Sequence, residues 1–183
     1  MLCINLILHF KAIGIHIRIY YILIYLTNKD CFFIIKMMKK VTIYTDGACS
    51  GNPGDGGWGA ILFYKDAKKE ISGYQENTTN NQMELTAAIK ALDLLKEPCE
   101  VDLYSDSAYL INAFQENWIT KWQLNGFRNS NKKQIQNLEL WQQLIELNNM
   151  HKINWIKVKG HADNIYNNRC DEMATGEISK MKK

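Results

Sequence analysis

Residues 41–54 constrain the fold of this chain more than any other stretch. Residues 41–45 (VTIYT) are mostly apolar and alternate enough to predict a β-strand. Asp46 follows at or near the predicted strand end, where a carboxylate can leave the core and face a cleft. The glycine- and proline-rich run at 47–54 then predicts a tight turn, because glycine adopts backbone angles that other residues avoid. Taken alone, the stretch favours a hairpin turn with a solvated aspartate.

The chain is long enough for one domain with a sizeable core. It has 183 residues, and 46% of them are hydrophobic, which is ordinary for a globular protein. The formal net charge of +3 is too small to indicate a nucleic-acid partner by itself. The five cysteines are odd in number, and no pair has the spacing of zinc ligands. We therefore expect free thiols in a reducing compartment, the cytoplasm.

Residues 1–38 differ in composition from the rest, being rich in Ile, Leu and Tyr with a single acid. A transmembrane helix is disfavoured because lysine and arginine interrupt the apolar runs. A secretory signal is disfavoured because no obvious small-residue cleavage site follows, and an isolated strand at 12–20 would be marginal. We therefore expect an apolar leader outside the working protein, with translation starting at Met37 or Met38 and a domain at 39–183.

The domain alternates strand and helix patterns. The first three strands are joined by short turns and predict an antiparallel meander. A helix follows near Asn80, with apolar residues spaced along one face. Helices between the later strands imply crossover connections and some parallel pairing, so we expect an α/β fold with a mixed sheet. The predicted strands are residues 41–45, 57–64, 70–74, 101–105 and 153–158.

Four acidic residues lie at the ends of these elements. Asp46 and Asp106 each follow a strand, and they are neighbours if the first and fourth strands pair. Glu84 lies in the first turns of the helix near Asn80, and Asp171 lies at the start of the last helix. Each has an ordinary explanation as well: Glu84 would pair with the helix dipole, and Asp106 would cap the next helix. We expect Asp106 to do both jobs.

Converging carboxylates would point to metal chemistry. Such a cluster is unstable unless protons or cations neutralise it. Oxygen ligands suit hard cations such as Mg²⁺ or Mn²⁺. Two such ions about 4 Å apart can activate a water and stabilise the leaving oxygen in phosphodiester cleavage.

Several motifs in the same order resemble type 1 ribonuclease H, close to the bacterial ribonuclease HI form. They are TDGACSGNPG at 45–54, TNNQMEL at 79–85, SDS at 105–107, VKGHA at 158–162 and NRCDE at 168–172. The resemblance covers residues 40–176, essentially everything but the leader. It implies a five-stranded mixed sheet, three antiparallel strands and then parallel ones, with helices on both faces.

The resemblance also implies an activity, which is endonucleolytic hydrolysis of the RNA strand of an RNA–DNA hybrid. Cleavage would be independent of sequence and would leave 5′-phosphate and 3′-hydroxyl ends. Asp46, Glu84, Asp106 and Asp171 match the four metal-binding acids, for two Mg²⁺ ions or Mn²⁺. His161 matches a mobile-loop histidine that assists proton transfer or product release, although alone it would be an ordinary surface histidine.

Further residues match substrate-binding positions of the family. Cys49, Asn52, Asn80 and Asn81 match positions that line the hybrid groove, and Thr79 matches a DNA-phosphate contact. Telling RNA from DNA requires sensing the 2′-hydroxyl, and amide side chains and exposed backbone suit that task.

Residues 117–136 carry basic side chains and no acid, interleaved with aromatic residues. They match the basic protrusion that holds the DNA strand in this family, through phosphate contacts that weaken with salt. A solvated basic helix with its tryptophans in the core is the plainer interpretation, since Trp118 and Trp122 share a helical face. The residues assigned here are Trp118, Lys121, Trp122, Lys132 and Lys133.

Two departures from the family pattern stand out. Ala108 replaces a polar residue, and residues 163–168 lack the usual Gly, His, Pro and Glu. The alternatives to a nuclease are a catalytically silent hybrid-binding module and, from the leader alone, a membrane-tethered protein. Integrases and junction resolvases share the fold, but the groove residues favour the hybrid-specific branch. We expect a monomer without stable membrane association.

Overall fold

The structure is a computed structural model that describes residues 3–6, 21–26, 31–36, 38–129, 131–159 and 164–181. The chain divides into two compact units, Met1–Lys39 and Lys40–Lys183. In the first unit, β1 (Cys3–Leu6), β2 (Tyr21–Leu26) and β3 (Cys31–Lys36) form an antiparallel sheet in that order. The strand considered at 12–20 lies outside the described residues.

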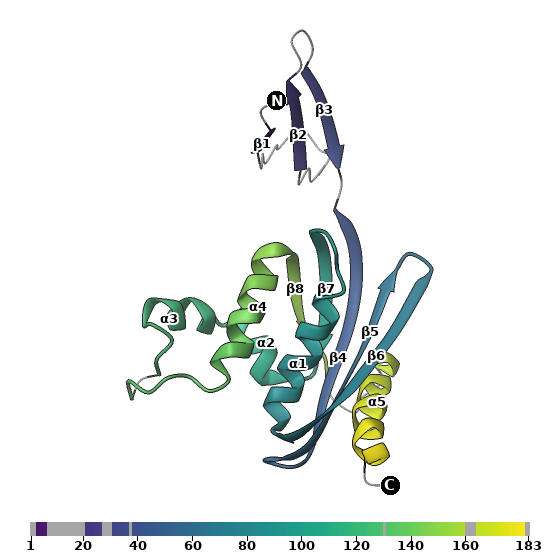
Figure 1. Ribbon diagram of the computed structural model, residues 1–183, viewed down its shortest axis with the longest axis vertical. Helices are drawn as coiled ribbons and strands as arrows, with labels where there is room; N and C mark the ends of the chain where they lie inside the picture. The colour runs from purple at the N-terminus through teal and green to yellow at the C-terminus, as the bar shows by residue number, and fades with distance from the viewer. Residues whose placement is uncertain are drawn as a thin grey trace. The chain divides into compact units, whose positions relative to one another are not determined.

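The second unit contains the predicted five-stranded mixed sheet, in the order β6-β5-β4-β7-β8 (Figure 1). The pairs β4–β5 and β5–β6 are antiparallel, and β7 and β8 are parallel. This confirms the expected meander followed by parallel strands. The strands are β4 (Lys39–Gly51), β5 (Gly54–Tyr64), β6 (Ala67–Thr78), β7 (Cys99–Ser105) and β8 (Lys152–Lys157).

Strand β4 is longer than predicted, which changes the place of Asp46. The sequence predicts a turn directly after this residue, but β4 runs on to Gly51, and Asp46 pairs with Gly59 in mid-strand. The hairpin turn comes only between Gly51 and Gly54, where Gly51 has a φ of +96°. The physical reason is that small residues at 47–51 keep the ladder with β5, because glycine permits a turn without requiring one.

Helices cover both faces of the sheet, as expected (Figure 1). Helices α1, α2 and α4 pack on one face with the small helix α3 beyond them, and α5 lies on the other face. The described helices are α1 (Asn80–Leu92), α2 (Ala108–Gln115), α3 (Trp118–Leu124), α4 (Leu138–Met150) and α5 (Ile165–Met181). None of the helices in the described residues is both long and apolar enough to span a membrane.

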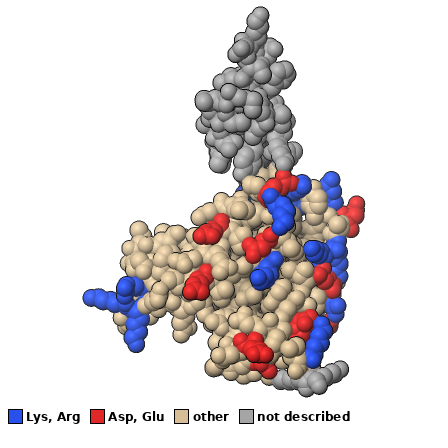
Figure 2. All heavy atoms as spheres, in the orientation of Figure 1, with Lys and Arg blue, Asp and Glu red and all other residues tan. Residues whose placement is uncertain are grey.

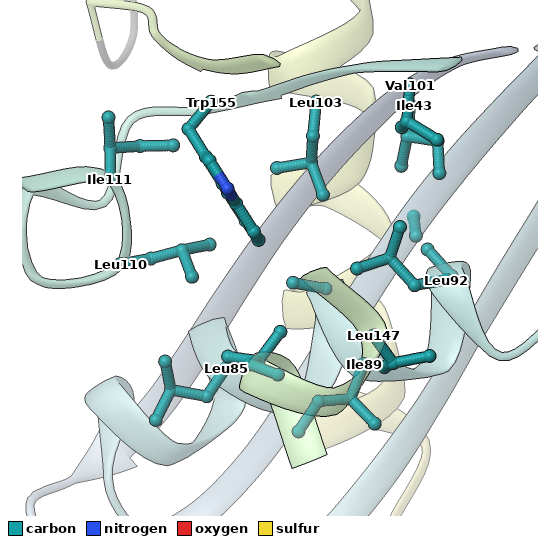
Figure 3. Packing of buried hydrophobic residues seen from close by; sticks show 14 of the residues in the cluster. Ile43, Leu85, Ile89, Leu92, Val101, Leu103, Leu110, Ile111, Leu147 and Trp155 are labelled. Atoms are coloured by element: carbon teal, nitrogen blue, oxygen red, sulfur yellow. The ribbon is translucent and has the colours of Figure 1, made fainter. Parts of the chain in front are cut away.

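The hydrophobic core lies between the sheet and the three-helix layer (Figure 3). Alternate residues of β7 face it, so Val101 and Leu103 are fully buried whereas Asp102 and Tyr104 face the opposite side. Side chains from α1, α2 and α4 meet them there, and Trp155 of β8 lies among them. The residues of β4 and β7 that face away from this core therefore face the side of α5.

Helix α5 lies against the backbone of β5. A Cβ atom added to Gly57 would overlap the carbonyl oxygen of Ala174, and one added to Gly59 would lie 2.5 Å from that of Cys170. Both helix residues are small and buried, one helical turn apart. Glycine is needed at both strand positions because any side chain would push the helix away from the sheet.

We predict that Gly57→Ala destabilises the protein by about 1–3 kcal/mol, the usual cost of overpacking a close-packed contact. Gly176→Ala in the same helix is the matched control, because nothing lies within 4 Å of its added Cβ. That control is expected to stabilise by about 0.4–1 kcal/mol, since alanine loses less backbone freedom than glycine on folding. Denaturant unfolding of both variants tests this. Equal effects of the two substitutions would contradict the close packing of α5.

Candidate active site

Three of the four predicted acids come together. The carboxylate oxygens of Asp46, Glu84 and Asp106 include a set that all lie within 4.8 Å of one another. Asp46 and Glu84 are buried, with 7% and 5% of their surfaces exposed, whereas Asp106 is half-buried. They come from β4, from α1 and from the residue after β7, so the fold assembles this acidic cluster from distant parts of the chain.

Two donors hold the Asp46 carboxylate. Its Oδ1 accepts a hydrogen bond from the backbone N–H of Gly47 at 2.8 Å, and its Oδ2 accepts one from Nδ2 of Asn167 at 3.3 Å. The first donor belongs to the same strand, and the second belongs to α5. Asp46 therefore faces the side of the sheet on which α5 lies.

Glu84 approaches from the opposite layer, past Gly47. A Cβ atom at Gly47 would overlap the backbone of Met83 and Glu84, so the first turn of α1 lies directly against β4. This close approach brings the Glu84 carboxylate to Asp46 and Asp106. Its Oε2 is buried and accepts no hydrogen bond from any described residue. An acceptor in this state is costly unless a cation or a water supplies its partner.

Asp106 does not cap the following helix, so the expectation of a double role is wrong. The N-cap of α2 is Ser107, whose Oγ accepts from the N–H of Leu110 at 3.3 Å. Serine is a good capping residue, and here it stands directly before the first helical residue. The cap therefore does not use the Asp106 carboxylate, which lies in the acidic cluster instead.

A stacked tyrosine pair lies beside the acids. Tyr44 precedes Asp46 by two residues and Tyr104 precedes Asp106 by two, and their ring centroids are 4.7 Å apart at 15°. Tyr166 of α5 packs on Tyr44, with ring centroids 5.1 Å apart. These contacts join β4, β7 and the first turn of α5 next to the carboxylates.

Asp171 is not part of the group of three but lies close enough to act on it. It is half-buried in α5, one turn beyond Asn167. Its negative charge contributes to raising the pKa of both Asp46 and Glu84. The fourth predicted acid is thus an electrostatic neighbour of the other three.

Burial and mutual repulsion raise the pKa values of the two buried acids, Asp46 and Glu84. Burial, followed by the charges of Asp106 and Asp171, raises the pKa of Asp46 to about 8. Burial, followed by the charges of Asp46 and Asp106, raises the pKa of Glu84 well above its ordinary value. An all-oxygen donor set that is short of positive charge fits a hard divalent cation, and the unpartnered Glu84 oxygen supports that fit.

The predicted groove residues lie at the junction of two connections. The Cys49 thiol donates to the carbonyl oxygen of Thr78 at 3.3 Å, and Asn52 Oδ1 accepts from the N–H of Asn80 at 3.3 Å. The β4–β5 hairpin and the start of α1 are therefore held together. Thr79 caps α1 in a capping box with Gln82, and Asn81 is exposed in the first turn.

The predicted protrusion, residues 117–136, has tryptophans packed against α4 and exposed basic side chains beyond them. Trp122 packs edge-on against Trp141 of α4, with centroids 5.2 Å apart, and Trp118 lies 6.1 Å from Trp122. Both tryptophans are half-buried against the core, which supports their structural interpretation. Exposed cations gather at the far end (Figure 2). Arg128, Lys132 and Lys133 are exposed in the loop after α3, and Lys121 is exposed on α3 itself.

One predicted site residue cannot be placed, and one residue at the site was missed. His161 lies outside the described residues. Asn167, which contacts Asp46, was not singled out from the sequence, although its spacing of four from Asp171 puts both on one face of α5.

Comparisons with known proteins identify the family of this chain. The family model described as RNase H matches residues 38–179. A ribonuclease H of Acetivibrio thermocellus is 68% identical over 146 residues, covering 80% of this chain and 99% of the relative. One of Caldanaerobacter subterraneus subsp. tengcongensis is 64% identical over 140 residues, covering 76% and 92%.

A solved structure is similar as well. It is LC9-RNase H1, described as a type 1 RNase H with the type 2 active-site motif. It has a TM-score of 0.71 and 25% identity, covering 79% of this chain and 74% of that one. Since the family model spans most of the chain and the relatives are matched over nearly their whole length, this chain belongs to the ribonuclease H family.

Proposed function

We propose that this protein is an endonuclease that hydrolyses the RNA strand of RNA–DNA hybrids with two Mg²⁺ ions held by Asp46, Glu84, Asp106 and Asp171. The observation that carries the proposal is the convergence of three carboxylates within 4.8 Å, two of them buried and one half-buried. Membership of the ribonuclease H family supports the substrate and the reaction.

Each acid has a distinct place in this proposal. Asp46, Glu84 and Asp106 would hold the ions, because their oxygens already lie together. Asp171 would complete the set from α5, and its half-buried position keeps it near solvent. When bound, the ions supply an activated water and stabilise the charge on the leaving oxygen. We assign His161 to proton transfer or product release on the resemblance alone.

Hybrid recognition is assigned to the junction between the β4–β5 hairpin and α1. Asn52, Asn80 and Asn81 are exposed amides there, and Cys49 lies beside them. Such groups can meet the 2′-hydroxyl of RNA, which both donates and accepts hydrogen bonds. Amide contacts to sugar edges carry no base information, so cleavage independent of sequence follows.

The DNA strand is assigned to Thr79 and to the protrusion. Lys121, Lys132 and Lys133 are exposed cations without a neighbouring acid in residues 117–136. They suit phosphate contacts, which provide affinity without specificity. Trp118 and Trp122 would hold this segment in place, because the two rings pack on each other and Trp122 packs on Trp141 of α4.

We also infer that residues 39–183 carry the activity, as a monomer in the cytoplasm without stable membrane association. The match of the family model to residues 38–179 supports this domain. Free thiols at Cys49 and Cys170 are consistent with a reducing compartment.

The proposal is tested with labelled RNA–DNA hybrid, single-stranded RNA, RNA duplex and DNA duplex, each with Mg²⁺ or with chelator. We expect only the RNA strand of the hybrid to be cut, and only with Mg²⁺, because the cluster lacks positive charge of its own. Binding of the hybrid without cleavage would favour the silent binding module. Cleavage in excess chelator would contradict the metal assignment.

Asp46→Asn is expected to lower hybrid cleavage by about 10³-fold, because a catalytic metal ion stabilises the transition state by several kcal/mol. Hybrid binding should remain, since the groove and the protrusion are unchanged. Asp66→Asn, in the exposed turn after β5, is the control and should cleave normally. Single-turnover cleavage and filter binding measure the two properties separately. Full activity of Asp46→Asn would exclude its role as a metal ligand.

Stability without ions is expected to fall as pH rises from about 4 towards 8. The folded protein holds the Asp46 proton up to about pH 8, whereas the unfolded chain releases it near pH 4, so rising pH favours unfolding across this window. Mg²⁺ should oppose the loss, and Asp46→Asn should reduce it. Urea unfolding in chelator at several pH values measures this. A slope that is the same in Asp46→Asn would rule out Asp46 as its source.

A further inference from the structure

Asn167 is a buried amide that contacts a member of the acidic cluster. Its side chain comes from the first turn of α5, and Nδ2 donates to Oδ2 of Asp46 at 3.3 Å. Only 2% of its surface is exposed, and Asp46 is nearly as buried. The contact joins two residues that lie 121 positions apart in the chain.

Packing alone does not explain an amide at this position. The Asn167 nitrogen faces Asp46 and donates to it, which is the orientation that Asp46 would need when a bound cation keeps it ionised, because an ionised carboxylate only accepts hydrogen bonds. The Oδ1 atom of Asn167 is then left buried, with no donor among the described residues. Burying an amide oxygen in this way is unfavourable, whereas leucine of similar volume would bury no polar atom. The amide therefore offers Asp46 a donor at a cost in stability.

The donor completes a clamp on the Asp46 carboxylate. Gly47 N–H holds Oδ1 at 2.8 Å from within β4, and Asn167 holds Oδ2 from α5. Two donors on different elements fix the plane of the carboxylate. Each oxygen keeps acceptor capacity for a cation, because a carboxylate has about four acceptor sites.

The position of Asn167 is itself fixed by its neighbours. Asn164 Oδ1 accepts from the N–H groups of Tyr166 and Asn167 at 3.2 and 3.1 Å, which caps the first turn of α5. The Tyr166 ring packs on Tyr44 and on Phe63, whose centroid lies 4.8 Å away. The amide is thus carried on an ordered turn that packs against the strand of Asp46.

We propose that Asn167 is a positioning residue, which holds the Asp46 carboxylate in the orientation that binds the divalent cation. The inference rests on the cation site of the proposed function and not on the identity of the nucleic acid. Outer-shell partners of this kind orient metal ligands, and losing one typically weakens metal affinity by about 10–100-fold.

The test is a titration of each purified full-length variant with Mn²⁺ alone, following the free ion by electron paramagnetic resonance. Asn167→Leu keeps the volume and removes the donor. Asp46→Asn measures any binding outside the cluster, and Ile178→Val is a matched packing change in the same helix, buried away from the acids. Asn167→Ser serves in place of the leucine variant if that variant does not fold.

We expect Asn167→Leu to bind Mn²⁺ about 10–100-fold more weakly than the unsubstituted protein, as for other lost outer-shell partners. Its kcat on hybrid should fall at fixed ion concentration and recover as the ion is raised, with KM for the hybrid unchanged. Ile178→Val should lower the melting temperature and leave Mn²⁺ affinity unchanged.

Equal Mn²⁺ affinity in Asn167→Leu and the unsubstituted protein would overturn the proposal. So would a loss of affinity in Ile178→Val as large as in Asn167→Leu, because the effect would then reflect helix packing. If the unsubstituted protein bound Mn²⁺ at the cluster but cut no hybrid, the proposed function would fail while the role of Asn167 would still be decided by the titration.

Discussion

Electrostatic repulsion among buried carboxylates is the constraint on which the rest of this structure depends. The fold brings Asp46, Glu84 and Asp106 together where little water can screen them, and places Asp171 near enough to add to the repulsion. Without cations, the folded state must keep protons that the unfolded chain would release at neutral pH. The protein thus gives up stability at this site, and a divalent ion bound as we propose would restore it by neutralising the charge. This cost is the clearest physical argument for the metal-binding role that we propose for the cluster.

Close backbone packing on both faces of the sheet makes the cluster possible. On the core side, Gly47 lets the first turn of α1 approach β4, so that Glu84 reaches Asp46. On the other side, Gly57 and Gly59 let α5 lie against β5, so that Asn167 reaches the same carboxylate. Because these glycines have no side chain, the helix backbone can approach the strands closely. In this way two helices from opposite layers deliver polar groups to one point on the central strand.

Much of this could be predicted from sequence, because strand and helix periodicity and the acids that follow them are local signals. A mixed sheet with helices packed on it was predicted in this way. The family, the five strands and the helices on both faces were implied by the resemblance of several motifs to type 1 ribonuclease H. Local signals failed where contacts between distant segments determine the structure.

The glycines after Asp46 indicated a turn, but pairing with β5 keeps them in the strand. The N-cap of α2 is Ser107 and not Asp106, because Ser107 stands directly before the helix. Helix α4 was not assigned, although Trp141, Leu144, Ile145 and Leu147 mark its buried face. Asn167 was missed because a hydrogen bond across 121 residues leaves no local pattern.

Because α5 packs directly on Gly57 and Gly59 of β5, the geometry of the acidic cluster depends on the packing of this C-terminal helix. Because the helix touches strand backbone at Ala174 and Cys170, it cannot shift slightly and keep its contacts. Its docking is then nearly all-or-none, and each transient detachment removes Asn167 and Asp171 from the acids together. Detachment of this helix and loss of the proposed ion site would then be a single local unfolding event. Ion occupancy would then govern how often the C-terminal segment opens to proteases and to hydrogen exchange.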